Sequence, residues 1–314
     1  MKKQALFLLL ALTACSVKEM TMEPRLADEN LRISLGGEIV QEYATRASDS
    51  GFADGDEIGV YVVDYEGSTP GELKNSGNRA DNLRFTFNES AWKWTPDHEI
   101  YYKDKNTHID VYGYYPYGSP SDVEAWEFEV QKDQADEGGD GKMSSYEASD
   151  LLWGVSLDNE PAARTITLKF KHIMASARVS LVEGSGFDSA EWASLEKSVI
   201  TESAVRTASV NLKTGEVSVK GSRPATGTIA YRSGADWRCI IVPQTIVAGD
   251  ALFSVTVGGL SYSLRKGDDF TFTSGKQHNF TITVNKRTET GTYEFVLSGE
   301  SITPWENDPV SHDA

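Results

Sequence analysis

The fold is decided by two neighbouring stretches, EIVQEYATRA at residues 38–47 and FADGDEIGVYVV at residues 52–63. The first is an apolar, strand-like piece that leads into a lone arginine, Arg46, before Ala47 and a run of small polar residues. The second starts with turn chemistry, Asp-Gly-Asp, and continues as a long β-rich run. Because small polar loop tips are preferred sites of proteolytic cleavage, the bond between Arg46 and Ala47 is a candidate processing site. A solvated linker arginine is the alternative interpretation.

The composition favours many short strands over long helices. The chain has 314 residues, enough for two domains of ordinary size, and 39% of them are apolar. Glycine, serine and threonine are abundant, which is typical of strands joined by turns. The formal net charge is −17, and no basic cluster occurs in the sequence. Nucleic acid is therefore excluded as a partner.

The N-terminus has the pattern of a lipoprotein signal. Two lysines, Lys2 and Lys3, precede the short apolar run at residues 5–12, which is too short to span a bilayer comfortably. The next residues, LTAC at 12–15, resemble a bacterial lipobox, in which cleavage leaves an acylated cysteine. We expect residues 1–14 to be a signal peptide and Cys15 to be lipidated, with polar residues 16–30 as a tether. An ordinary signal peptide with a chance cysteine is the alternative.

Alternating apolar and polar residues recur along the rest of the chain and predict half-buried strands. Many short strands separated by turn residues indicate an all-β protein built from β-sandwiches. We expect residues 47–160 and 161–314 to form an N-terminal and a C-terminal domain, because polar residues and Pro161 interrupt the strands there. One segment differs: Trp192, Leu195 and Val199 have helical spacing after Asp188, which predicts one short, capped helix in the second domain.

The sequence offers no catalytic or metal-binding constellation. The five histidines have no metal-ligand spacing, and neither a phosphate-binding loop nor a nucleophile elbow is present. Cys239 lies in an apolar strand with no nearby histidine, so we expect a buried structural thiol. We therefore predict a protein that is not an enzyme and uses neither cofactor nor metal.

Aromatic residues crowd the first half and suggest an alternative function. Aromatic faces can stack on sugars, so a glycan-binding surface is one interpretation, and packing in the core is the favoured one. The residues are Trp92, Trp94, Tyr101, Tyr102, Tyr112, Tyr114, Tyr115 and Tyr117.

Several phrases together resemble the fimbrillin family of Bacteroidales-type fimbriae, in its Mfa-like branch. The resemblance extends from Cys15 to Trp305, and it rests on the order and spacing of the phrases. They are LTAC at 12–15, TRA at 45–47 ahead of FADGDEIGVY at 52–61, LKFKHIMA at 168–175, VPQT at 242–245, SGKQHNFTITV at 274–284 and ITPW at 302–305.

The resemblance implies a structure and a function. It implies two transthyretin-like β-sandwich domains, export as a lipoprotein to the outer membrane, and cleavage by an arginine-specific protease at Arg46. The removed segment, residues 15–46, would have supplied a strand, from Leu31–Leu35 and Ile39–Val40. A C-terminal strand of the next fimbrillin subunit would replace it, giving a homo- or hetero-polymeric fimbrium that serves adhesion. Candidate donor residues are Tyr293, Phe295, Leu297, Ile302 and Trp305.

A different function stays open. The chain could be a monomeric or anchor-type surface lipoprotein that keeps its lipid at Cys15 and binds a glycan or a surface protein. We interpret His172 as a structural strand residue and Trp305 as a packing residue under either function.

Overall fold

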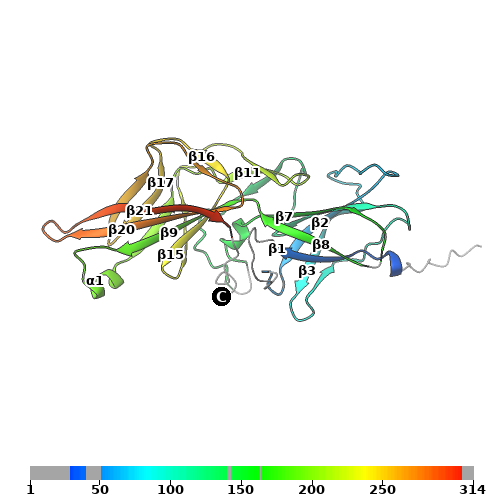
Figure 1. Ribbon diagram of the computed structural model, residues 1–314, viewed down its shortest axis with the longest axis horizontal. Helices are drawn as coiled ribbons and strands as arrows, with labels where there is room; N and C mark the ends of the chain where they lie inside the picture. The colour runs from blue at the N-terminus through cyan, green and yellow to red at the C-terminus, as the bar shows by residue number, and fades with distance from the viewer. Residues whose placement is uncertain (1–28, 40–50, 140–142, 163, 306–314) are drawn as a thin grey trace, which may run out of the picture.

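The computed structural model describes residues 29–39, 51–139, 143–162 and 164–305. In this part of the chain the regular secondary structure is almost entirely β-strand, with one short α-helix and two 3₁₀ turns. The molecule is elongated, with β1, β2, β3, β7 and β8 at one end and β17, β20, β21 and α1 toward the other (Figure 1). No helix in the described ranges has the length and apolar character needed to cross a membrane. The predicted all-β class is confirmed for these residues.

The first half forms a seven-stranded sheet around the long β-rich run identified in the sequence. In spatial order the strands are β1 (Ser34–Ile39), β8 (Thr165–His172), β7 (Leu152–Asn159), β5 (Ile109–Tyr115), β2 (Glu57–Asp64), β3 (Ala80–Asn88) and β4 (Lys93–Pro96). The run at 52–63 supplies β2, which lies between β5 and β3 and is buried along almost its whole length. Apolar side chains on both faces explain this continuous run, because both faces of the strand are covered.

The second half contains two larger sheets. The first has the order β14 (Tyr231–Ser233), β15 (Asp236–Ile241), β9 (Ala175–Glu183), β20 (Lys276–Arg287) and β21 (Thr292–Pro304). The second has the order β13 (Thr228–Ile229), β10 (Lys197–Thr201), β17 (Ala251–Val257) and β18 (Leu260–Arg265). One hydrophobic cluster takes alternate residues from both sheets, as expected when two sheets pack face to face.

Smaller elements complete the described structure. A three-stranded sheet has the order β12 (Glu216–Val219), β11 (Thr207–Asn211) and β6 (Trp126–Glu129), and β16 (Gln244–Ile246) pairs with β19 (Phe270–Phe272). The 3₁₀ turns are Glu29–Leu31 and Glu147–Ser149. The α-helix α1 spans Ser189–Ser194, within the segment where the helical spacing predicted it, but it ends before Val199, which lies in β10. The Asp188 carboxylate accepts a 2.7 Å hydrogen bond from the Glu191 amide and caps the helix.

Three strand pairings in the described residues cross between the halves of the sequence, and the parallel pairing of β1 with β8 is one of them. The expected boundary at residues 160 and 161 lies between β7 and β8, which pair with each other in the seven-stranded sheet. Strand β6 of the first half pairs with β11 of the second. A third hydrophobic cluster follows from this pairing, since it combines Tyr61 and Trp153 with Trp126, Val210 and residues as late as Trp305.

Most of the crowded aromatic residues belong to the cores. Trp94, Tyr102, Tyr114 and Tyr115 are buried, whereas Trp92 is 58% exposed. This confirms core packing as the main role of the group. Cys239 is also buried, as predicted, and burial raises the pKa of its thiol to about 12.

Candidate functional site

The segment at residues 31–39 closes one side of the seven-stranded sheet. Its strand β1 is terminal in the sheet and pairs in parallel with β8, from Ser34 opposite Thr165 to Ile39 opposite Phe170. The residues just before β1 form main-chain hydrogen bonds with residues 100–102 instead of with β8. The Ile33 amide donates to the Ile100 carbonyl at 2.9 Å, and the Leu31 carbonyl accepts from the Tyr102 amide at 2.8 Å. The segment therefore bridges β8 and residues 100–102.

The inward side chains of this segment belong to the hydrophobic core of the first half. Ile33 and Leu35 are 2% and 4% exposed, and Leu31 and Ile39 pack against the same cluster at its margin. Their partners include Leu168 and Phe170 of β8 and Trp94 of β4. Removal of the segment would uncover these side chains and leave the main-chain groups of β8 without partners on that side. We call the space that the segment occupies the β1 slot.

The shape of the β1 slot favours glycine at position 37. A Cβ atom added to Gly37 would lie 3.1 Å from both Phe170 Cε2 and Trp94 Nε1. Both are ring atoms of buried side chains, so the ring packing would have to shift to admit even a methyl group. The slot therefore takes a large side chain at position 35 and has little room for one at position 37.

Charged groups border the slot but contribute little to the stability of the segment in it. Arg32 lies 2.9 Å from the Glu99 carboxylate, and Glu38 lies 3.9 Å from Lys169 Nζ. All four side chains are substantially exposed to solvent, where ion pairs contribute little to stability. Apolar burial and main-chain hydrogen bonds hold the segment in place.

The structure places part of the predicted removable strand in this slot. Residues 31–35 and Ile39 lie in the segment as described, whereas Val40 is outside the described residues. The predicted lipidation site Cys15 and the predicted cleavage site at Arg46 and Ala47 are also outside the described residues. Cleavage at Arg46 would release the whole segment, since residues 31–39 all precede it.

The candidate donor residues lie on and just beyond β21. This 13-residue strand is terminal in its sheet and pairs antiparallel with β20. It runs from the far end of the second half back toward the middle of the molecule (Figure 1). Tyr293, Phe295 and Leu297 face the core and are partly buried, whereas Ile302 is 56% exposed. The first three therefore have the apolar, alternating face that strand addition uses.

Trp305 follows β21 and contacts the first half of the chain. Its ring is buried and stacks on the imidazole of His172, the last residue of β8. His172 Nδ1 lies 2.8 Å from the Asp150 carboxylate. These contacts are those of a packed structural pair, as interpreted from the sequence for both residues.

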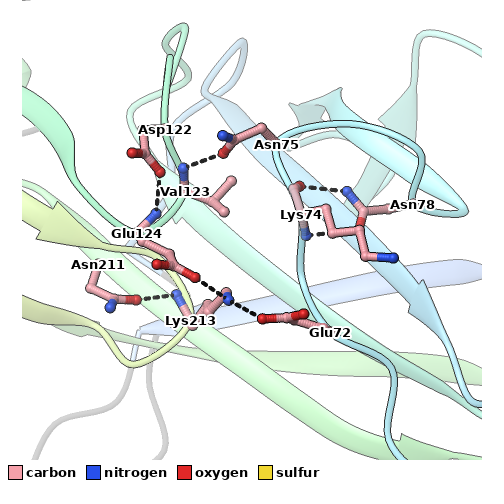
Figure 2. Close-up of polar contacts among 9 residues, drawn as sticks. All are labelled: Glu72, Lys74, Asn75, Asn78, Asp122, Val123, Glu124, Asn211 and Lys213. Atoms are coloured by element: carbon pink, nitrogen blue, oxygen red, sulfur yellow. Dashed lines mark hydrogen bonds and ion pairs between the residues drawn. The ribbon is translucent and has the colours of Figure 1, made fainter.

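A polar cluster that the sequence did not reveal joins the two halves (Figure 2). Lys213, from the turn between β11 and β12, lies between the carboxylates of Glu72 and Glu124, at 3.0 Å from Glu72 Oε1. The hydrogen bond and charge of Lys213 lower the pKa of Glu72, and the two carboxylates raise the pKa of Lys213. The side-chain carbonyl of Asn75 accepts from the Val123 amide at 2.7 Å. No local pattern links residues so distant in sequence.

Metal-binding geometry is not present in the described ranges, where no three His, Cys, Asp or Glu side chains gather in a form that could hold a metal ion. The candidate site consists instead of the β1 slot and β21. Such an arrangement can exchange strands, because each strand is the last of its sheet and covers an apolar face.

Comparison with protein families and curated proteins gives two matches. The model of a family described as fimbrillin-like matches residues 45–305. Over 93 residues the chain is 36% identical to Fim1C of Bacteroides ovatus, which is named as a candidate fimbrium tip subunit. That match covers 28% of this chain and 15% of Fim1C, so it spans a small part of that relative.

Two solved structures share the fold. A candidate cell adhesion protein from Bacteroides uniformis has a TM-score of 0.64 at 17% identity, covering 89% of this chain and 100% of its own. Another, from Bacteroides ovatus, has a TM-score of 0.62 at 16% identity, covering 88% of this chain and 98% of its own. At such low identity the likeness is one of fold.

Proposed function

The chain belongs to the fimbrillin-like family, and on this premise we propose that it is a structural subunit of a fimbrium that serves cell adhesion. Its family is one of structural adhesion proteins, which agrees with the prediction that it is not an enzyme. We propose further that it is exported as an outer-membrane lipoprotein and polymerised by strand exchange after cleavage at Arg46. The observation that carries the proposal is the β1 slot, whose occupant lies entirely upstream of Arg46.

Cleavage would convert a closed sheet into an acceptor. Loss of the segment removes Ile33 and Leu35 from the core and frees the edge of β8 for another strand. Exposed apolar area costs roughly 25 cal/mol per Å², so a subunit with an open slot gains free energy by accepting a strand. Main-chain hydrogen bonds to β8 would add affinity, and the alternating pockets would select the register.

The proposed partners follow from this cycle. They are an arginine-specific protease, the outer membrane through lipid on Cys15, and other fimbrillin subunits that donate and accept strands. After cleavage, attachment through lipid is replaced by attachment to the neighbouring subunit. The protein would then lie in the fimbrium at the cell surface.

We also propose that the strands form two transthyretin-like β-sandwich units. Two separate hydrophobic clusters, one beneath β1 and β8 and one between β9 and β17, support this division. Because β8 pairs with β7 and β1, a boundary after His172 fits the pairing better than one at residues 160 and 161.

A monomeric or anchor-type lipoprotein that binds a glycan is the second candidate. It rested on the aromatic residues of the first half, and their burial weakens it, since a buried ring offers no face to a sugar. Trp92, at 58% exposed, and Tyr117, at 36%, are the members of that group whose exposure suits such a role. Glycan-array binding that is lost in a Trp92→Ala chain would support this candidate over the first.

The deciding measurement is the N-terminus and intact mass of the protein recovered from the cell surface. The proposal expects a chain that begins at Ala47 and runs as ladders of high apparent mass. An Arg46→Ala chain should remain uncleaved and monomeric, and an Arg25→Ala chain serves as the matched control with an intact cleavage site. Fibres of normal length from the Arg46→Ala chain would overturn the proposal. An acylated chain that begins at Cys15 and runs as a single species would favour the second candidate.

A further inference from the structure

The indole nitrogen of Trp94 is a buried donor with no hydrogen bond to any residue that the structure describes. Trp94 lies in β4 and is 3% exposed, and its Nε1 atom meets no acceptor within the described ranges. Its ring contacts are the rings of Phe52 and Phe87, which carry no oxygen. A buried donor that has lost water and gained no acceptor lowers stability, so such groups are rare in folded proteins.

This donor lies against the β1 slot. A Cβ atom added to Gly37 would lie 3.1 Å from Trp94 Nε1, as close as it would lie to Phe170 Cε2. Strands β1 and β4 are the two terminal strands of the seven-stranded sheet, so the contact between Gly37 and Trp94 joins its opposite edges. The strand in the slot therefore decides which group the indole nitrogen meets.

Strand β1 fits the shape of the slot but does not supply an acceptor for this donor. The residue beside the indole is glycine, which has no side chain, and the preceding residue, Gly36, is also glycine. Two glycines inside a strand weaken it, because they lose more backbone entropy on folding and offer no side chain to pack. The backbone does not demand glycine here, since the φ angle of Gly37 is not positive. Another strand can therefore bind this part of the slot better than β1.

A small side chain that ends in an oxygen atom would complete the site. Phe170 and Trp94 limit the space beside Gly37, so a large or branched side chain would press on both rings. Serine is the smallest side chain with an oxygen, and its hydroxyl can accept a hydrogen bond from the indole N–H. It needs only a small movement of the two rings, which the new hydrogen bond offsets.

We infer that Trp94 determines the specificity of the β1 slot by selecting a strand with a small oxygen-bearing side chain, such as serine, at the position of Gly37. This inference rests on the proposed strand exchange and adds the chemistry that the slot recognises. The partner strand carries apolar side chains at the positions of Ile33 and Leu35 and the hydroxyl two residues later. Because it satisfies the indole and β1 does not, the difference in affinity favours exchange in one direction.

Substitutions at position 37 of the full-length, uncleaved chain test the inference. Gly37→Ser and Gly37→Ala add the same Cβ atom and press on the same two rings, so the difference between them isolates the hydroxyl. We expect Gly37→Ser to have the higher urea midpoint, with an unfolding equilibrium constant about fivefold smaller than that of Gly37→Ala, the effect of one net hydrogen bond. Equal midpoints would overturn the inference.

The same two substitutions in a Trp94→Phe chain are the matched control. Phenylalanine keeps an aromatic ring and removes the donor, so the advantage of serine over alanine should vanish, and its persistence would assign the effect to another group. If the Trp94→Phe chain does not fold, the indole proton of Trp94 gives a second readout by nuclear magnetic resonance. Its signal, identified through contacts with Phe52 and Phe87, should move downfield in Gly37→Ser relative to Gly37→Ala, and an unchanged signal would contradict the inferred hydrogen bond.

The rate of assembly connects the chemistry of the slot to the proposed function. After cleavage at Arg46 a better-bound β1 leaves the slot more slowly, so Gly37→Ser chains should form ladders of high apparent mass more slowly than Gly37→Ala chains. Equal rates, despite a higher urea midpoint for Gly37→Ser, would overturn the role of Trp94 in exchange. Absence of ladders from the unmodified, processed protein would instead overturn strand exchange itself, and the uncleaved chains would still decide what Trp94 recognises.

Discussion

The indole of Trp305 stacks on the imidazole of His172, with ring centroids 4.1 Å apart and ring planes inclined by 11°. His172 ends β8, the strand that β1 covers, and Trp305 follows β21. The stack therefore connects the end of the candidate donor strand to the strand that forms the acceptor slot of the same chain. Donation of β21 to another copy would have to separate this pair.

We predict that Trp305→Ala destabilises the uncleaved chain by about 3 kcal/mol, because it removes a buried aromatic ring from the core. Urea denaturation of the full-length protein measures this change. Ile302→Ala, at an exposed position near the end of β21, serves as the control and should change stability by roughly 0.5 kcal/mol or less. Equal effects of the two substitutions would contradict the packing role of Trp305.

Gly37→Val should destabilise the uncleaved chain by about 1–3 kcal/mol, since its side chain would press on Phe170 and Trp94. Gly267→Val is a suitable control, because a Cβ atom there has no neighbour within 4 Å. The midpoint of urea unfolding compares the two variants with the unmodified chain. After cleavage at Arg46 the effect of Gly37→Val should vanish, and its persistence in the processed chain would argue against removal of β1.

Stability should fall at acidic pH through His278. This residue is fully buried, its Nε2 accepts a 2.9 Å hydrogen bond from the Thr273 amide, and burial lowers its pKa below the usual 6.5. The folded state then binds the proton less well than the unfolded state. The stabilisation is present above about pH 6.5 and is lost as the pH falls through the lowered pKa.

Urea midpoints at neutral and acidic pH test this dependence. His278→Gln, which keeps an acceptor for the Thr273 amide, should lose less stability on acidification than the unmodified chain. His98→Gln, at an exposed position, should behave like the unmodified chain. An unchanged acid dependence in His278→Gln would assign the effect to other groups.

Cys239 should not react with thiol reagents in the folded protein. Its side chain is 2% exposed, and desolvation raises its pKa to about 12, so the nucleophilic thiolate is scarce at pH 8. A Cys15→Ser chain isolates this thiol for measurement with Ellman's reagent. Labelling should occur in denaturant and not in buffer, and rapid labelling of the folded chain would contradict the burial of Cys239.

Some structural features could be predicted from short stretches of residues. Asp188 caps α1 because its carboxylate reaches the amide three residues later, a contact set by local geometry. Strand β5 ends at Tyr115 because Pro116 has no amide hydrogen to donate. The face of β21 that carries Phe295 and Leu297 follows from the two-residue period of a strand.

Other features lay beyond any local pattern. The sequence of the aromatic run at 112–117 favours core packing but is also compatible with an exposed platform, and only packing against other sheets buries Tyr114 and Tyr115. The sequence around Lys213 does not indicate that its side chain pairs with Glu72 and Glu124, since these partners come from distant loops. The division near Pro161 was inferred from a polar turn, and that turn joins two strands of one sheet.

The sequence by itself determined the β class of this protein, the position of its short helix and the inward face of each edge strand, because neighbouring residues set capping, turns and alternation. Tertiary structure alone decided that β1 lies parallel to β8, that Gly37 sits beneath Phe170 and Trp94, and that Trp305 reaches His172. These relationships join residues far apart in the chain. The pairing of one strand with another depends on the shape and burial of the whole core, which no single stretch of sequence contains.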